Sequence, residues 1–78
     1  MKQQLISFLG ELWMSDVERI EDSYVTNNPA VVIYPTCGLF GQGLLTTLIK
    51  FADNNGYRFY ISAFDDDVRM RIYEDVES

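Results

Sequence analysis

The stretch RFYISAFDDDVRMRIYE, residues 58–74, decides the fold because it contains two strand-like runs around an acidic turn. Apolar and polar side chains alternate in both runs, and Val, Ile, Tyr and Phe are typical of strands. Three consecutive aspartates separate the runs, and Asp tolerates the backbone angles of tight turns. We therefore predict a hairpin of strands 58–64 and 68–74 joined by a turn at Asp65–Asp67.

The period-two pattern of this hairpin predicts two different faces. With Asp66 and Asp67 as the central turn residues, Asp65 lies opposite Val68. One face is then apolar and is expected to be core: Phe59, Ile61, Ala63, Val68, Met70 and Ile72. The outward face carries the other set: Tyr60, Ser62, Phe64, Arg69, Arg71 and Tyr73. We prefer this register to a one-residue slip because each buried aliphatic side chain contributes about 1.5–3 kcal/mol.

Upstream, residues 3–21 predict a helix. Their apolar positions recur at spacings of three, four and seven, which is the helical pattern. Ser15 and Glu18 also form a capping-box pattern, in which each side chain satisfies a backbone N–H at a helix start. The alternative is therefore a helix that breaks near Met14 and restarts at Asp16.

A second hairpin and a second helix follow. Asn27-Asn28-Pro29 is a turn signal between a short extended segment, Ser23–Thr26, and the β-rich segment Ala30–Tyr34. The latter is apolar at successive positions, so we expect a central strand covered on both sides. Residues 43–54 have an apolar helical stripe, and Gly56 can adopt the left-handed conformation that ends a helix.

Together these elements predict the order α-β-β-α-β-β. The fold class is α+β, with a four-stranded, mostly antiparallel sheet and both helices packed on one face. Residues 1–78 form one small domain, since a chain of this length supports one core. Residues 1–39 and 40–78 align as a weak internal repeat in which helix, turn and strand positions coincide.

Composition excludes several classes of protein. Of the 78 residues, 47% are hydrophobic and 14% aromatic, which is not the composition of a disordered chain. The net charge of −6 argues against direct nucleic-acid binding, which needs a basic surface. No run approaches the length of a membrane span and the N-terminus does not read as a signal peptide. With a single thiol, Cys37, we expect a cytoplasmic protein.

The motifs that carry chemistry are weak in this sequence. It contains no histidine, so Cys-His and Ser-His-Asp catalysis are excluded. The loop 37–43 has the spacing G-x-x-G-x-G, which matches neither the dinucleotide nor the Walker pattern; we expect a turn anchored by Phe40. Cys37 is expected to be a half-buried apolar residue. Consecutive aspartates do not supply alternating calcium ligands. We therefore expect no enzyme activity, no cofactor and no metal.

The outward face of the last hairpin is the leading candidate site. Tyr and Arg are enriched at interface hot spots because each combines a large contact area with a polar tip. We expect a partner protein to contact that face and the acidic residues beside it: Tyr60, Phe64, Arg69, Arg71, Tyr73, Asp65, Asp66, Asp67, Glu74 and Asp75. The predicted function is a non-enzymatic inhibitor or antagonist that occupies a partner's surface. Small acidic immunity proteins and phage-encoded defence inhibitors, such as anti-CRISPR proteins, share this profile as a class.

Several alternatives stay open from the sequence. The tyrosines can simply pack on the sheet while the arginines pair with nearby acids. A homodimer through the outward face would use the same surface, and stacked nucleic-acid bases also suit such a platform. In nucleic-acid mimicry, the carboxylates of Asp65–Asp67, Glu74, Asp75 and Glu77 would replace phosphates in the groove of a nucleic-acid-binding protein. Finally, the Gly38–Gly43 loop could hold a small ligand or an anion.

Overall fold

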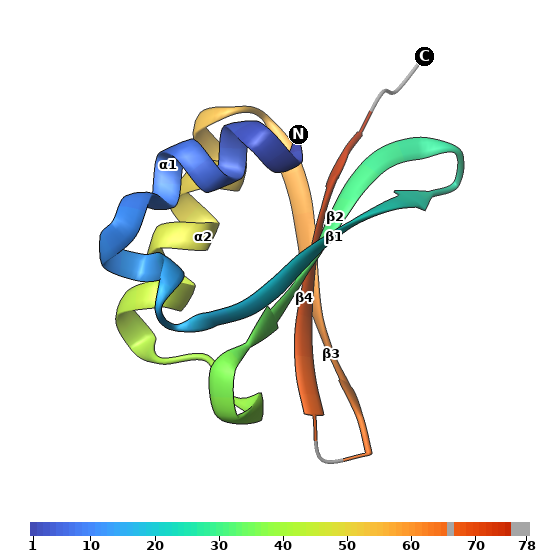
Figure 1. The fold of residues 1–78 in the computed structure, drawn as a ribbon. Helices are drawn as coiled ribbons and strands as arrows, with labels where there is room; N and C mark the ends of the chain where they lie inside the picture. Colours follow the sequence, from blue (N-terminus) through green and yellow to red (C-terminus); the bar gives the residue numbers. More distant parts are fainter. Residues whose placement is uncertain (66, 76–78) are drawn as a thin grey trace.

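The protein folds as two α-β-β units whose four strands form one antiparallel sheet (Figure 1). The computed structural model describes residues 1–65 and 67–75. The strand order is β1-β2-β4-β3, and α1 and α2 lie on the same side of the sheet (Figure 1). The predicted α+β class and element order are confirmed. The elements are α1 (Lys2–Met14), β1 (Val17–Val25), β2 (Asn28–Pro35), the short 3-10 helix η1 (Thr36–Gly38), α2 (Gln42–Asn54), β3 (Tyr57–Phe64) and β4 (Asp67–Glu74).

The core lies between the two helices and the middle of the sheet. Each helix contributes residues at helical spacing, and the two central strands contribute alternate residues. The most deeply buried side chains are Leu5, Leu44, Leu48, Phe51, Val31, Ile33, Met70 and Ile72. Helix α2 ends as predicted, because Gly56 takes a φ of 69° just beyond its last turn.

The prediction of a helix over residues 3–21 is wrong beyond Met14. The chain leaves α1 at that residue, and β1 follows instead of a second helix. A β-bulge causes the misleading pattern: the pairing with β2 shifts between Val17 and Arg19. The extra residue puts Val17 and Ile20 on the buried side although they are three apart, which mimics a helical spacing. Ser15 does not begin a second helix; it is the C-cap residue of α1, and its carbonyl accepts a hydrogen bond from the Thr36 hydroxyl at 3.4 Å.

The first hairpin turns earlier than predicted. Val25 pairs with Asn28, so the turn consists of Thr26 and Asn27, which have φ values of 51° and 71°. Two positive φ values in a two-residue loop match the right-handed twist of the flanking strands. Pro29 lies within β2 rather than in the turn. The strand β2 is central, as predicted, although the helices cover only one of its faces (Figure 1).

The second hairpin has the predicted faces in a different register. Phe64 pairs with Asp67, so the turn starts at Asp65, which has a φ of 57°, and not at Asp66. The predicted turn residue Asp66 itself lies outside the described residues. The shift changes each pairing by two positions, and an even shift leaves every side chain on its predicted face.

The prediction that β3 contributes to the core is wrong. Phe59 and Ile61 face the helix side but remain 39% and 44% exposed, and Ala63 is exposed as well. The strand order explains this in part, because β3 is an edge strand, and its C-terminal half also extends past the helices (Figure 1). In β4, which is central, Met70 and Ile72 are fully buried as predicted.

Candidate functional site

The side of the sheet that faces away from the helices, here called the outer face, carries the candidate site. Cross-strand partners project to the same side of a sheet, so the pairings define which residues share it. Three rows cross the four strands: Arg19, Tyr34, Arg69 and Ser62; then Glu21, Val32, Arg71 and Tyr60; then Ser23, Ala30, Tyr73 and Arg58. The predicted residues Tyr60, Arg69, Arg71 and Tyr73 are all on the outer face.

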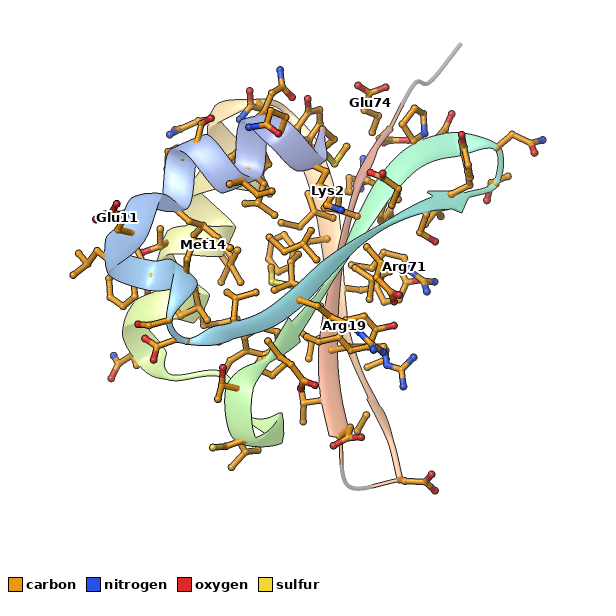
Figure 2. The ribbon with its side chains drawn as sticks, in the orientation of Figure 1. Lys2, Glu11, Met14, Arg19, Arg71 and Glu74 are labelled. Atoms are coloured by element: carbon orange, nitrogen blue, oxygen red, sulfur yellow. The ribbon has the colours of Figure 1, made fainter. Side chains whose placement is uncertain are left out.

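All four arginines of the chain lie on the outer face. Figure 2 shows Arg19 and Arg71 pointing to the side opposite the helices. Within residues 1–65 and 67–75, the Nε atom of Arg19 is 3.8 Å from the Oε1 atom of Glu21, and Arg58 forms an ion pair with Asp75. The guanidinium groups of this acidic chain, whose net charge is −6, are therefore gathered on one face, where carboxylates such as those of Glu21 and Asp75 accompany them.

Tyr34 is at the centre of the first row. The Cζ atoms of Arg19 and Arg69 lie 4.2 and 5.3 Å from the centroid of its ring. Guanidinium groups within about 6 Å of an aromatic face are attracted to its negative potential. One ring on β2 thus orients two cations that come from β1 and β4.

A second cluster links the next two rows. The Nη1 atom of Arg71 donates to the Tyr60 hydroxyl over 2.6 Å, and its Cζ atom lies 5.6 Å from the Tyr60 ring centroid. Tyr60 and Tyr73 contact edge to face, with centroids 6.0 Å apart and planes at 64°. Because planar groups lock one another in this way, little rotamer freedom remains to be lost on binding.

The arginine and tyrosine side chains of the outer face also bury part of the sheet beneath them. Val32 and Ala30 are each only 3% exposed, although they face away from both helices. Long arginine and tyrosine side chains cover them, as amphipathic side chains do when they keep a polar tip in water. Tyr60 itself stays 39% exposed, so its ring is open to contact.

A pocket of about 150 Å³ opens at one end of the outer face. Two arginines, two carboxylates and the Tyr34 ring give it a mixed-charge lining, so it suits a polar side chain better than an apolar one. Its residues are Glu18, Arg19, Tyr34, Pro35, Gly38, Asp67, Val68 and Arg69. A second, wider pocket of about 550 Å³ lies on the helical side, lined by Gln3, Gln4, Ser7, Phe8, Phe51 and Asn55.

The predicted acidic residues are not brought together. Asp67 is the first residue of β4 and Glu74 is the last, so the acidic turn and the acidic tail lie at opposite ends of one strand. Asp75 is engaged with Arg58. Glu74 lies near Tyr57, and burial together with the Glu74 charge raises the pKa of that phenol. Asp66 and Glu77 lie outside the described residues, as does the side chain of Phe64.

Sequence reasoning missed the half of the outer face that comes from β1 and β2. Arg19 was assigned to a helix, and Tyr34 was treated only as part of a buried strand. The signal that could have found them is the segment Val17–Val25, where charged and polar residues follow a β-branched start. Read as an edge strand paired with β2, it places Arg19 beside Tyr34.

The glycine-rich loop has packing explanations. Phe40 packs against the core, as predicted, and Gly41 is the residue before α2. A Cβ on Gly43 would lie 2.6 Å from the Trp13 ring, so this position needs glycine for helix packing. Cys37 is exposed with a φ of 66°, which corrects the expectation that it is half-buried.

No group of three or more His, Cys, Asp or Glu side chains in the described part of the chain could hold a metal ion. Among the same residues, no helix is both long and apolar enough to cross a bilayer. Comparisons with protein families, curated proteins and solved structures find no match to this chain.

Proposed function

We propose that this chain is a non-enzymatic protein-binding module that inhibits or antagonises a partner protein by occupying its surface through the outer face. The observation that carries the proposal is the gathering of all four arginines with Tyr34, Tyr60 and Tyr73 on the one helix-free side of the sheet. Arg and Tyr are the residue types most enriched among interface hot spots.

The size of the outer face fits this role. Four strands of eight or nine residues, about 3.3 Å per residue and about 4.8 Å apart, make a sheet of about 500 Å², which suits a small interface, whereas a standard one uses about 800 Å² per partner. The guanidinium groups are held by aromatic rings before a partner arrives, which reduces the ordering cost of binding.

Charge indicates the kind of partner. On the outer face the guanidinium groups lie beside carboxylates such as those of Glu21 and Asp75, which favours a protein surface that presents charges of both signs. Further acids, Glu18 and Asp67, line the pocket beside Arg19 and would repel a row of phosphates. This mixture favours a protein partner over a nucleic-acid strand, although tyrosines can stack on bases.

Nucleic-acid mimicry gains no support from the geometry. A mimic needs carboxylates repeated along one surface, whereas the turn and the tail acids lie at opposite ends of β4. One of them, Asp75, is already neutralised by Arg58.

The test is capture from a cell lysate, identification of the retained protein and measurement of its affinity for variants. Arg19→Ala and Tyr60→Ala, on the outer face, should each weaken binding at least about tenfold. Lys50→Ala and Tyr24→Ala are matched controls, because both side chains are exposed away from the outer face. They should leave the affinity unchanged.

Two results would overturn the proposal. One is a partner whose affinity changes with the controls and not with the outer-face variants. The other is tight binding of a single-stranded oligonucleotide that weakens steeply between about 0.1 and 0.5 M salt and is lost in Tyr60→Ala. The latter result would make the outer face a base-stacking platform.

A further inference from the structure

The two edge strands of the sheet differ in the features that prevent pairing with a strand of another chain. On one edge, β1 carries four charged side chains, Glu18, Arg19, Glu21 and Asp22, and a bulge at its start. Charges and bulges of this kind prevent an edge strand from pairing with another chain.

The opposite edge, β3, has no bulge and a single charged residue. Within Tyr57–Phe64 the only charge is Arg58, and the following six residues, FYISAF, are uncharged and strongly β-forming. Every residue of 58–63 is exposed, on both sides of the strand. The pairing with β4 is regular along the whole of β3, so the outer backbone groups form an unbroken row.

Apolar side chains flank this row of backbone groups. Phe59 and Ile61 are 39% and 44% exposed on the helix side of β3, and Tyr60 is 39% exposed on the outer face. A long, uncharged edge strand with exposed apolar side chains is unusual in a chain that stays monomeric.

We propose that the chain forms a two-fold symmetric homodimer in which the β3 strands of two copies pair antiparallel into one eight-stranded sheet. The low charge and the regular pairing of this edge favour a second copy of the chain as its partner. A partner strand must be uncharged and must present apolar groups on the helix side, and the same segment of another copy meets both conditions.

Sheet geometry restricts the register. Residues that oppose each other across two paired strands point to the same side of the sheet. Two copies of β3 can therefore pair only so that the two-fold axis lies midway between the two copies of one residue. An axis at Tyr60 places Phe59 of each copy opposite Ile61 of the other, twice, on the helix side. It also places Arg58 opposite Ser62, which keeps the two Arg58 side chains from facing each other.

The symmetry also limits the assembly to two copies. Like-to-like pairing uses both β3 edges and leaves the two charged β1 edges at the ends of the sheet, where further addition is blocked. One strand pair spans only about 25 Å and lies at the small end of stable interfaces. We therefore expect a dimer that dissociates in the micromolar range.

The first test is sedimentation equilibrium of the full chain from about 1 to about 300 μM, concentrations that bracket a micromolar Kd. The wild type should shift from monomer to dimer. Ile61→Lys adds a charge to the β3 edge and should weaken dimerisation at least about tenfold. Tyr24→Lys, a lysine on the exposed β1 edge, should not.

A wild type that stays monomeric throughout, or a dimer that Ile61→Lys leaves intact, would overturn the proposal.

A disulfide cross-link provides a second test that does not depend on whether Ile61→Lys folds. In a Cys37→Ser background, Tyr60→Cys brings two thiols to the two-fold axis with Cα atoms about 5 Å apart, within disulfide range. Oxidised glutathione should join them, each bond taking two electrons from two thiols. Glu21→Cys on the β1 side should give no covalent dimer, and failure of Tyr60→Cys to form one would refute the pairing.

The dimer and the proposed partner binding both use Tyr60, and a variant of Arg19 separates them. Arg19→Ala should weaken partner binding at least about tenfold without changing sedimentation, because Arg19 belongs to β1 at the other edge of the sheet. Loss of dimerisation in that variant would show that copies associate through the outer face, which would contradict pairing at β3.

Discussion

Replacing Gly43 with alanine tests whether this glycine serves helix packing or ligand binding. The added Cβ would lie 2.6 Å from the Cη2 atom and 3.0 Å from the Cζ3 atom of Trp13, closer than carbon atoms approach in folded proteins. Overpacking of this kind costs about 1–3 kcal/mol. The higher helix propensity of alanine returns at most about 1 kcal/mol. We expect a net loss of about 1 kcal/mol, seen as a fall in Tm of about 4–8 °C.

A double-mutant cycle isolates the contact, with urea denaturation as the assay. Trp13→Phe removes the ring edge that the new Cβ would meet, so Gly43→Ala should cost at least about 0.5 kcal/mol less in that background. Gly41→Ala is the control, since no atom lies within 4 Å of its added Cβ. It should show no coupling to Trp13. A Gly43→Ala protein as stable as wild type, with no coupling, would refute the packing argument and return this loop to the ligand-binding alternative.

Two further predictions concern the buried core and the titration of Tyr57. Leu48→Ala, at a fully buried position between helix and sheet, should lower the free energy of unfolding by about 2–5 kcal/mol. Leu12→Ala, at a 76% exposed position, should change it by less than about 0.5 kcal/mol. Equal losses of the two variants in urea denaturation would contradict the assigned core. Because burial and the charge of Glu74 raise the pKa of Tyr57 above 10.0, the folded state keeps this proton longer than the unfolded state, and stability should fall as pH rises past about 10. Tyr57→Phe should reduce that fall in thermal melts, and an equally steep fall in Tyr57→Phe and in the wild type would show that Tyr57 is not responsible.

Local patterns predicted those parts of the fold that depend on neighbouring residues. Alternation in β4 correctly placed Met70 and Ile72 in the core, and the stripe of α2 placed Leu48 there. The segment 17–21 misled the helix prediction because a bulge gives Val17 and Ile20 a helical spacing on one side of a strand. A bulge depends on the partner strand, which no local period reveals.

The candidate site also has one part that local patterns predict and another that depends on strand pairing. The β4 half of the outer face follows from alternation, since the two-residue register error left the faces unchanged. The contribution of β1 could not be predicted, because Arg19 reaches Tyr34 only when β1 pairs with β2. The exposure of Phe59 and Ile61 was likewise hidden, because it depends on β3 being the edge strand and not on its own sequence.

Some groups of the outer face cover the sheet, whereas others are exposed to solvent. The position of each residue shows to which set it belongs. Val32 is 3% exposed without a covering helix, so the stems and rings above it act as part of the core. Such groups would be retained even in a chain with no partner. The side chain of Arg19 is 57% exposed and its guanidinium already rests on Tyr34. Because that exposed tip contributes little to covering the sheet, Arg19→Ala should cost little stability, so a loss of binding in this variant would report on the proposed partner contact and not on unfolding.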